Sequence, residues 1–194
     1  MKKNAGLSTI MVTGLAAAIS IFTMVILVVI KGAVGGPSGS SEQAKLAEQK
    51  ADLIGQKFTE YANQADLDVF WYSNTNAVIF ASKTDIKVMW KEGANILHTT
   101  ISYDTSAFDE GISENDNKIA QAREKTKEMI GMKGTLLAPA VKSFMVYDSD
   151  TESGKLTLKI EYKDSEKKTH VLEKEYVVKW TEGVEATKLL NQGK

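Results

Sequence analysis

An uninterrupted apolar stretch near the start of the chain restricts its folding more than any other feature. Residues 4–30 carry no charged side chain, and the run from Ile10 to Ile30 is almost wholly apolar. A helix of about 20 apolar residues spans roughly 30 Å, the thickness of the hydrocarbon core of a bilayer. We therefore predict a transmembrane helix over residues 7–31.

The charges around this stretch predict its orientation. Lys2 and Lys3 precede it, and only Lys31 follows it closely. Basic residues favour the cytoplasmic side, so we expect a single-pass protein of the cell membrane with a cytoplasmic N-terminus and an extracytoplasmic domain over residues 42–194. A cleaved secretory signal peptide is the alternative. Such peptides have an apolar core of only about 7–15 residues, which favours the retained anchor.

The residues after the apolar stretch predict a linker and then a long helix. Residues 32–41 are rich in glycine and contain Pro37, which disfavours a helix. Small and large apolar residues then recur every three or four positions, the spacing of one helix face. We predict a helix from Glu42 to Ala65 that packs through this stripe, whose members are Ala47, Ala51, Ile54, Phe58 and Tyr61.

The remaining chain predicts strands around one further helix. Strands are expected at 68–72, 77–82, 86–90 and 96–103, with Lys91–Asn95 as a hairpin loop. Ser113–Asp116 has the form of a capping box, which predicts a helix from there to Ile130. A meander of three strands should follow at 141–147, 156–162 and 170–180. The predicted fold class is α+β: the amphipathic helix packed on an antiparallel β-sheet.

Composition and motifs argue against catalysis, metal binding and nucleic-acid binding. The formal net charge is −1 with mixed signs, so we expect no nucleic-acid partner. The chain has no cysteine, which excludes a thiol nucleophile or a thiolate metal site. His98 and His170 have no partners at metal-ligand spacing. We therefore expect that the protein is not an enzyme and that it binds no cofactor and no metal.

Two further segments have a structural and a functional interpretation. Asp148–Gly154 alternates oxygen-bearing side chains that could bind Ca²⁺, but it lacks the glycine and the glutamate of an EF-type loop. A polar hairpin tip is the better interpretation.

A groove for a ligand could be lined by aromatic residues, namely Phe70, Trp71, Tyr72 and Trp90. Aromatic residues in strands more often form the core, which is the structural interpretation.

In this order of parts the chain resembles the type IV pilin-like family, in particular minor pilins and pseudopilins. Residues 1–6 (Met-Lys-Lys-Asn-Ala-Gly) look like the short basic leader of that family, and Leu7–Ile10 like the start of its mature helix. Residues 76–82 and the C-terminal meander look like minor pilin domains. The resemblance implies a pilin-like fold and cleavage between Gly6 and Leu7 by a prepilin peptidase. It also implies a membrane location and pilin-like or secretion-machine subunits as partners.

Two positions depart from the family pattern. The family usually has Glu at the fifth mature position, where this chain has Met11, and Gly35–Pro37 interrupts the family's continuous helix. We therefore keep two functional expectations. One is a non-enzymatic minor pilin or pseudopilin-like subunit of a pilus, competence or secretion assembly. The other is a static bitopic structural subunit of a secretion or conjugation machine with an extracytoplasmic docking domain.

Overall fold

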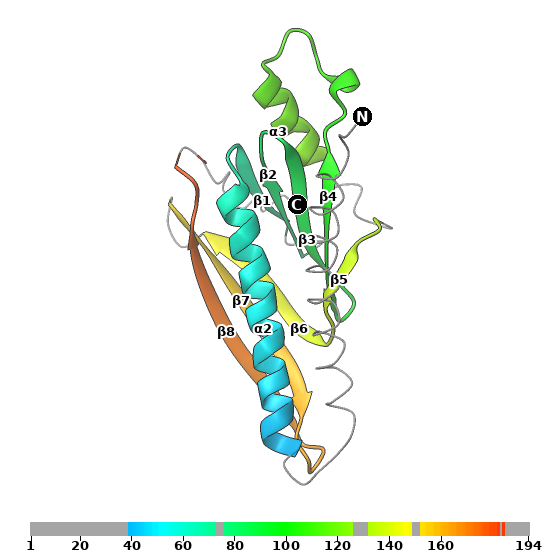
Figure 1. Cartoon of the computed structure of the whole chain (residues 1–194), viewed down its shortest axis with the longest axis vertical. Helices are drawn as coiled ribbons and strands as arrows, with labels where there is room; N and C mark the ends of the chain where they lie inside the picture. The colour runs from blue at the N-terminus through cyan, green and yellow to red at the C-terminus, as the bar shows by residue number, and fades with distance from the viewer. Residues whose placement is uncertain (1–38, 73–75, 126–131, 149–151, 183, 185–194) are drawn as a thin grey trace, which may run out of the picture.

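A computed structural model describes residues 39–72, 76–125, 132–148, 152–182 and 184. The described elements are two α-helices, a short 3₁₀ helix and eight strands (Figure 1). In chain order they are α2 (Gly39–Gln64), β1 (Asp68–Tyr72), β2 (Ala77–Ala81), β3 (Asp85–Glu92), β4 (Asn95–Ser102), η1 (Thr105–Ala107), α3 (Glu114–Lys125), β5 (Thr135–Ala138), β6 (Val141–Asp148), β7 (Ser153–Lys163) and β8 (Thr169–Lys179).

The first five strands form one antiparallel sheet in the order β1-β2-β3-β4-β5. A two-residue turn joins β3 to β4, and Gly93 in that turn has φ +58°, a conformation that glycine adopts without strain. This turn confirms the predicted hairpin loop. β5 pairs with β4 only after α3 has intervened in the sequence.

The last three strands form a separate antiparallel sheet in the order β6-β7-β8. Asp148 pairs with Gly154, so the predicted hairpin tip does connect two paired strands. Leu156, Leu158 and Ile160 alternate with polar residues along β7 and are all buried. This period of two gives the three-stranded sheet one apolar face.

A two-residue corner separates the two sheets. Pro139 and Ala140 lie between the end of β5 and the start of β6, and Ala140 has a positive φ of 63°. Proline cannot donate a ladder hydrogen bond, and the left-handed residue redirects the backbone. The amide of Val141 then donates to the carbonyl of Ala94 at 2.8 Å, which fixes the start of β6 beside the β3–β4 turn.

Helix α2 lies along the inner face of the three-stranded sheet and reaches the five-stranded sheet (Figure 1). The apolar face of the three-stranded sheet, the stripe of α2 and one face of the five-stranded sheet share a single core cluster. The Phe58 ring lies 5.4 Å from that of Phe80 on β2 and 6.4 Å from that of Trp180. One helix therefore joins both sheets.

Helix α3 covers the opposite face of the five-stranded sheet. Ala122 is buried in a second core cluster with Phe70 and Ile79. The hydroxyl of Ser113 accepts from the amide of Asp116 at 3.2 Å and donates to its carboxylate at 2.6 Å. Ser113 thus caps α3, as the sequence predicted, although the carboxylate accepts from the serine side chain instead of its backbone.

The predicted fold class is wrong in its architecture. We expected the amphipathic helix on an antiparallel β-sheet of the pilin-like kind, whereas the described chain forms two antiparallel sheets, of five and three strands, bridged by α2. The helix begins at Gly39, three residues before the predicted Glu42, and the strand β5 was missed. Strand assignment from local patterns does not reveal which strands pair with one another. The corner at Pro139 separates the strands of the five-stranded sheet from those of the three-stranded sheet.

The transmembrane part of the predicted fold also has no counterpart among the described helices. Within the residues that the structure describes, no helix is both long enough and apolar enough to cross a membrane. Residues 7–31, on which that prediction rests, lie outside the described residues, as does the leader at 1–6. The described helices therefore do not support the prediction of a single-pass membrane protein.

Candidate docking surface

The five residues predicted to pack α2 lie together in the shared core. Ala47, Ala51, Ile54, Phe58 and Tyr61 are all buried. They hold the helix in place and are not available to a partner. The predicted cleavage residues, Gly6 and Leu7, lie outside the described residues. Of the aromatic residues weighed as a groove, Phe70, Trp71 and Trp90 are buried in the core, as the structural interpretation predicted.

Both histidines bind neighbouring side chains. The hydroxyl of Tyr61 lies 2.8 Å from Nδ1 of His98, which joins the C-terminal half of α2 to β4. Burial, and then the charge of Lys57, lower the pKa of His98 below its usual value. The lowered pKa favours the neutral ring, in which Nδ1 can accept a hydrogen bond from the tyrosine hydroxyl. This pair fastens the helix to the five-stranded sheet.

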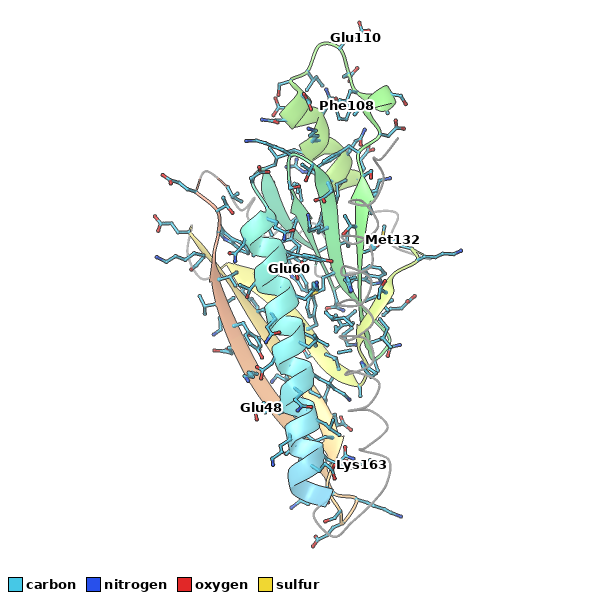
Figure 2. The ribbon with its side chains drawn as sticks, viewed as in Figure 1. Glu48, Glu60, Phe108, Glu110, Met132 and Lys163 are labelled. Atoms are coloured by element: carbon cyan, nitrogen blue, oxygen red, sulfur yellow. The ribbon has the colours of Figure 1, made fainter. Side chains whose placement is uncertain are left out.

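The second histidine closes the β7–β8 hairpin. One carboxylate oxygen of Asp164 accepts from the amides of Glu166 and Lys168, each at 2.9 Å, and the other lies 2.7 Å from Nε2 of His170. The hydrogen bond with His170 is the main reason why the pKa of Asp164 is lowered. Figure 2 shows Lys163, beside this turn, at the same end of the molecule as the start of α2. The sequence analysis missed this partner of His170.

A third polar group ties α2 to β8. One carboxylate oxygen of Asp52 accepts from Nζ of Lys174 at 2.6 Å and from the hydroxyl of Tyr176 at 2.8 Å. These hydrogen bonds, that of Lys174 first, lower the pKa of Asp52. Glu48, labelled on α2 in Figure 2, adds a carboxylate 3.5 Å from Lys174. Like the histidine pairs, this group satisfies its members within the fold.

These groups do not form a metal centre. Within the described ranges, no set of three or more His, Cys, Asp or Glu side chains is placed to hold a metal ion. Each polar group instead links two elements whose positions it fixes. The features that remain for recognition are therefore on the surface.

The outer face of the three-stranded sheet, which points away from α2, carries several large apolar side chains. The exposed fraction is 38% for Met145, 40% for Tyr147, 45% for Val171 and 64% for Val177. Tyr147 on β6 and Val177 on β8 both pair with Lys155, so the three side chains form one row across the sheet. Exposed apolar residues that gather on one face are typical of interaction surfaces.

Charged pairs lie between these apolar residues. Lys155 on β7 binds Glu175 on β8 at 2.6 Å, and Lys159 binds Glu173 at 3.0 Å. Such cross-strand ion pairs in water contribute little to stability, but they place opposite charges side by side on this face. The outer face thus combines exposed apolar groups with paired charged groups, a mixture that is common in non-obligate protein interfaces.

The sequence analysis did not identify this outer face. The alternation along β8 contains the signal, because Val171, Glu173, Glu175 and Val177 occupy every second position. Valine is common in strands on either face, so its exposure here could not be read from residue type. Only the pairing with β7 shows that the two valines lie on the side away from α2.

Comparison of the chain with protein-family models, with curated proteins and with solved structures finds no match.

Proposed function

We propose that this chain is a non-enzymatic docking subunit of a pilus, competence, secretion or conjugation assembly. The single observation that carries the proposal is the outer face of the three-stranded sheet. Its four large apolar side chains, Met145, Tyr147, Val171 and Val177, are exposed, although the opposite face of the same sheet is buried beneath α2. The class of assembly comes from the resemblance of the sequence to pilin-like proteins.

The residue types on this face suit protein contacts. Tyrosine and methionine are enriched at the centres of interfaces, and tyrosine buries a large area there at a low cost in conformational entropy. The ion pairs of Lys155 and Lys159 bring four charged groups into two neutral pairs. A partner would therefore meet an apolar surface whose neighbouring charges are already paired with one another.

Site-specific photo-crosslinking in the native cells tests the proposal. A photoreactive residue placed at Tyr147 or Val177 should form a cross-link to one defined subunit of such an assembly. Leu136 on β5 is a matched control, because it is apolar and 54% exposed but lies on the other sheet. Equal cross-linking from Leu136, or no defined product from Tyr147 and Val177, would contradict the proposal.

N-terminal sequencing separates the two kinds of subunit. A mature chain that begins at Leu7 would place the protein with the processed, pilin-like subunits. A retained Met1 in cells that possess a prepilin peptidase would place it with the static structural subunits. Both outcomes are compatible with docking through the outer face, so this measurement is independent of the cross-linking.

A further inference from the structure

Two backbone hydrogen bonds determine which way the peptide groups of β8 point. The amide of Trp180 donates to the carbonyl of Glu152 at 2.9 Å just beyond one end of the β7–β8 ladder. The amide of Asp164 donates to the carbonyl of Lys168 at 3.0 Å just beyond the other end. The register between them is continuous, and both bonded pairs join even-numbered residues.

Bonded and non-bonded pairs alternate in an antiparallel ladder. The even-numbered residues of β8 therefore bond to β7, and the odd-numbered residues direct their N–H and C=O groups away from it. The groups that point outward belong to Val171, Glu173, Glu175, Val177 and Lys179. β8 is the last strand of its sheet and follows the border of the molecule in Figure 1. In the described part of the chain, none of the backbone hydrogen bonds outside the ladders involves β8.

The side chains of the same odd-numbered residues lie on the outer face. Glu173 and Glu175 have side chains that are 53% and 51% exposed, and valines 171 and 177 lie two positions beyond them on either side. The edge therefore presents an apolar–acidic–acidic–apolar series together with peptide groups that point away from β7 and bond to none of the other described residues through their backbones. An added strand would match it with basic residues at two alternate positions and apolar residues at the positions outside them.

A second copy of β8 matches this series poorly. In the three registers with the longest overlap, antiparallel pairing of β8 with itself about residue 173, 174 or 175 would place Glu173 opposite Glu173, Glu173 opposite Glu175, or Glu175 opposite Glu175. Like charges directly opposite one another destabilise a strand pair. A chain with lysine or arginine at those positions meets both glutamates with the opposite charge.

We infer that β8 is a strand-addition site for an extended basic segment of another subunit. The inference rests on the proposed function, because it names the chemistry of the partner. It concerns the edge of the sheet, whereas the proposed docking surface is the outer face. The backbone of β8 would supply the hydrogen bonds, and Glu173 and Glu175 would select for positive charge.

The test uses the full chain and a synthetic probe, the capped peptide Thr-Val-Thr-Lys-Thr-Lys-Thr-Val-Thr. Binding should slow hydrogen exchange at the odd-numbered amides of β8, while the even-numbered amides, already bonded to β7, should change little. A control peptide with glutamate in place of both lysines should not bind. Protection of the even-numbered amides alone, or equal binding of the two peptides, would overturn the inference.

Two substitutions at one position separate the backbone from the side chain. Glu175→Pro removes an outward N–H and leaves the ladder with β7 intact, so affinity for the probe should fall about tenfold. Glu175→Gln keeps the N–H and removes the half-exposed charge together with its ion pair to Lys155, so affinity for the probe should fall only about threefold. Val171→Pro repeats the test if the first proline variant fails to fold. An equal loss in the proline and glutamine variants would contradict strand addition.

The two proposals fail in different ways. If the chain cross-links through Tyr147 but does not bind the lysine peptide, the proposal of docking through the outer face stands and that of strand addition at β8 is wrong. If the chain binds the peptide at β8 but gives no cross-link at Tyr147, the proposal of strand addition stands and that of docking through the outer face is wrong. A dimer of the full chain that Glu175→Pro dissociates would show that the occupant is a second copy, and would overturn the heterologous assignment.

Discussion

Gly55, in the middle of α2, lies directly against a tyrosine ring of β8. A Cβ atom at this position would lie 2.4 Å from Cε1 and 2.5 Å from Cδ1 of Tyr176. The ring cannot move without consequence, because its hydroxyl donates to Asp52 at 2.8 Å. We therefore expect Gly55→Ala to destabilise the fold, although alanine is the better helix former.

The expected magnitude follows from three opposing effects. Replacing glycine by alanine within a helix ordinarily gains about 1 kcal/mol. Overpacking against the ring should cost about 1–3 kcal/mol. Weakening of the half-exposed hydrogen bond to Asp52 should cost about 1 kcal/mol more. The free energy of unfolding should therefore fall by about 1–3 kcal/mol.

A double-mutant cycle tests this reasoning. Urea unfolding of the full chain, followed by tryptophan fluorescence, gives the change in midpoint at constant slope. In a Tyr176→Ala background the ring is absent, so Gly55→Ala should instead stabilise the chain by about 1 kcal/mol. The effect of the same substitution should thus change sign between the two backgrounds. Stabilisation in both backgrounds would refute the proposed contact.

Other perturbations probe the core, the corner and the polar link. Phe58→Ala should cost about 3–5 kcal/mol of unfolding free energy in urea, whereas Glu60→Ala on the exposed side of α2 should change it by under about 0.5 kcal/mol. Ala140 has φ 63°, so Ala140→Val should lower the free energy of unfolding by about 2 kcal/mol in the same assay, whereas Ala140→Gly should be nearly neutral. Similar values for the two variants would argue against the left-handed corner. Hydrogen bonds from Lys174 and then Tyr176 lower the pKa of Asp52. The ionised carboxylate therefore stabilises the fold above the unfolded pKa of about 3.9, and this stabilisation is lost as pH falls through the lower folded pKa. Asp52→Asn should therefore lower stability at pH 7 and reduce the loss on acidification below about pH 4, as thermal melts across that range would reveal.

Local patterns in the sequence were sufficient to predict most of the individual elements. The predicted strand at 68–72 has the bounds of β1, and the stripe that includes Ile54 and Phe58 lies on one helix. Both signals arise from neighbours along the chain, because a period of two or 3.6 records which side of an element is buried. The cap at Ser113 is local in the same sense.

The arrangement of those elements could not be predicted in the same way. β5 has only four residues and ends beside Pro139, so it shows no clear alternation. The division of the strands between two sheets depends on partners distant in sequence. The docking surface could not be predicted either, because the outward valines of β8 resemble core residues until the register with β7 and the face covered by the distant helix α2 are known.

The shared position of α2 also bears on how the protein can change in evolution. A substitution in the stripe of α2 must suit two sheets at once, because residues such as Phe58 pack against both Phe80 and Trp180. Exposed outer-face residues such as Tyr147 and Val177 carry no comparable packing burden, since substitutions at exposed positions typically change stability by less than about 0.5 kcal/mol. Variants could therefore acquire a new partner through the outer face while the interior stays unchanged.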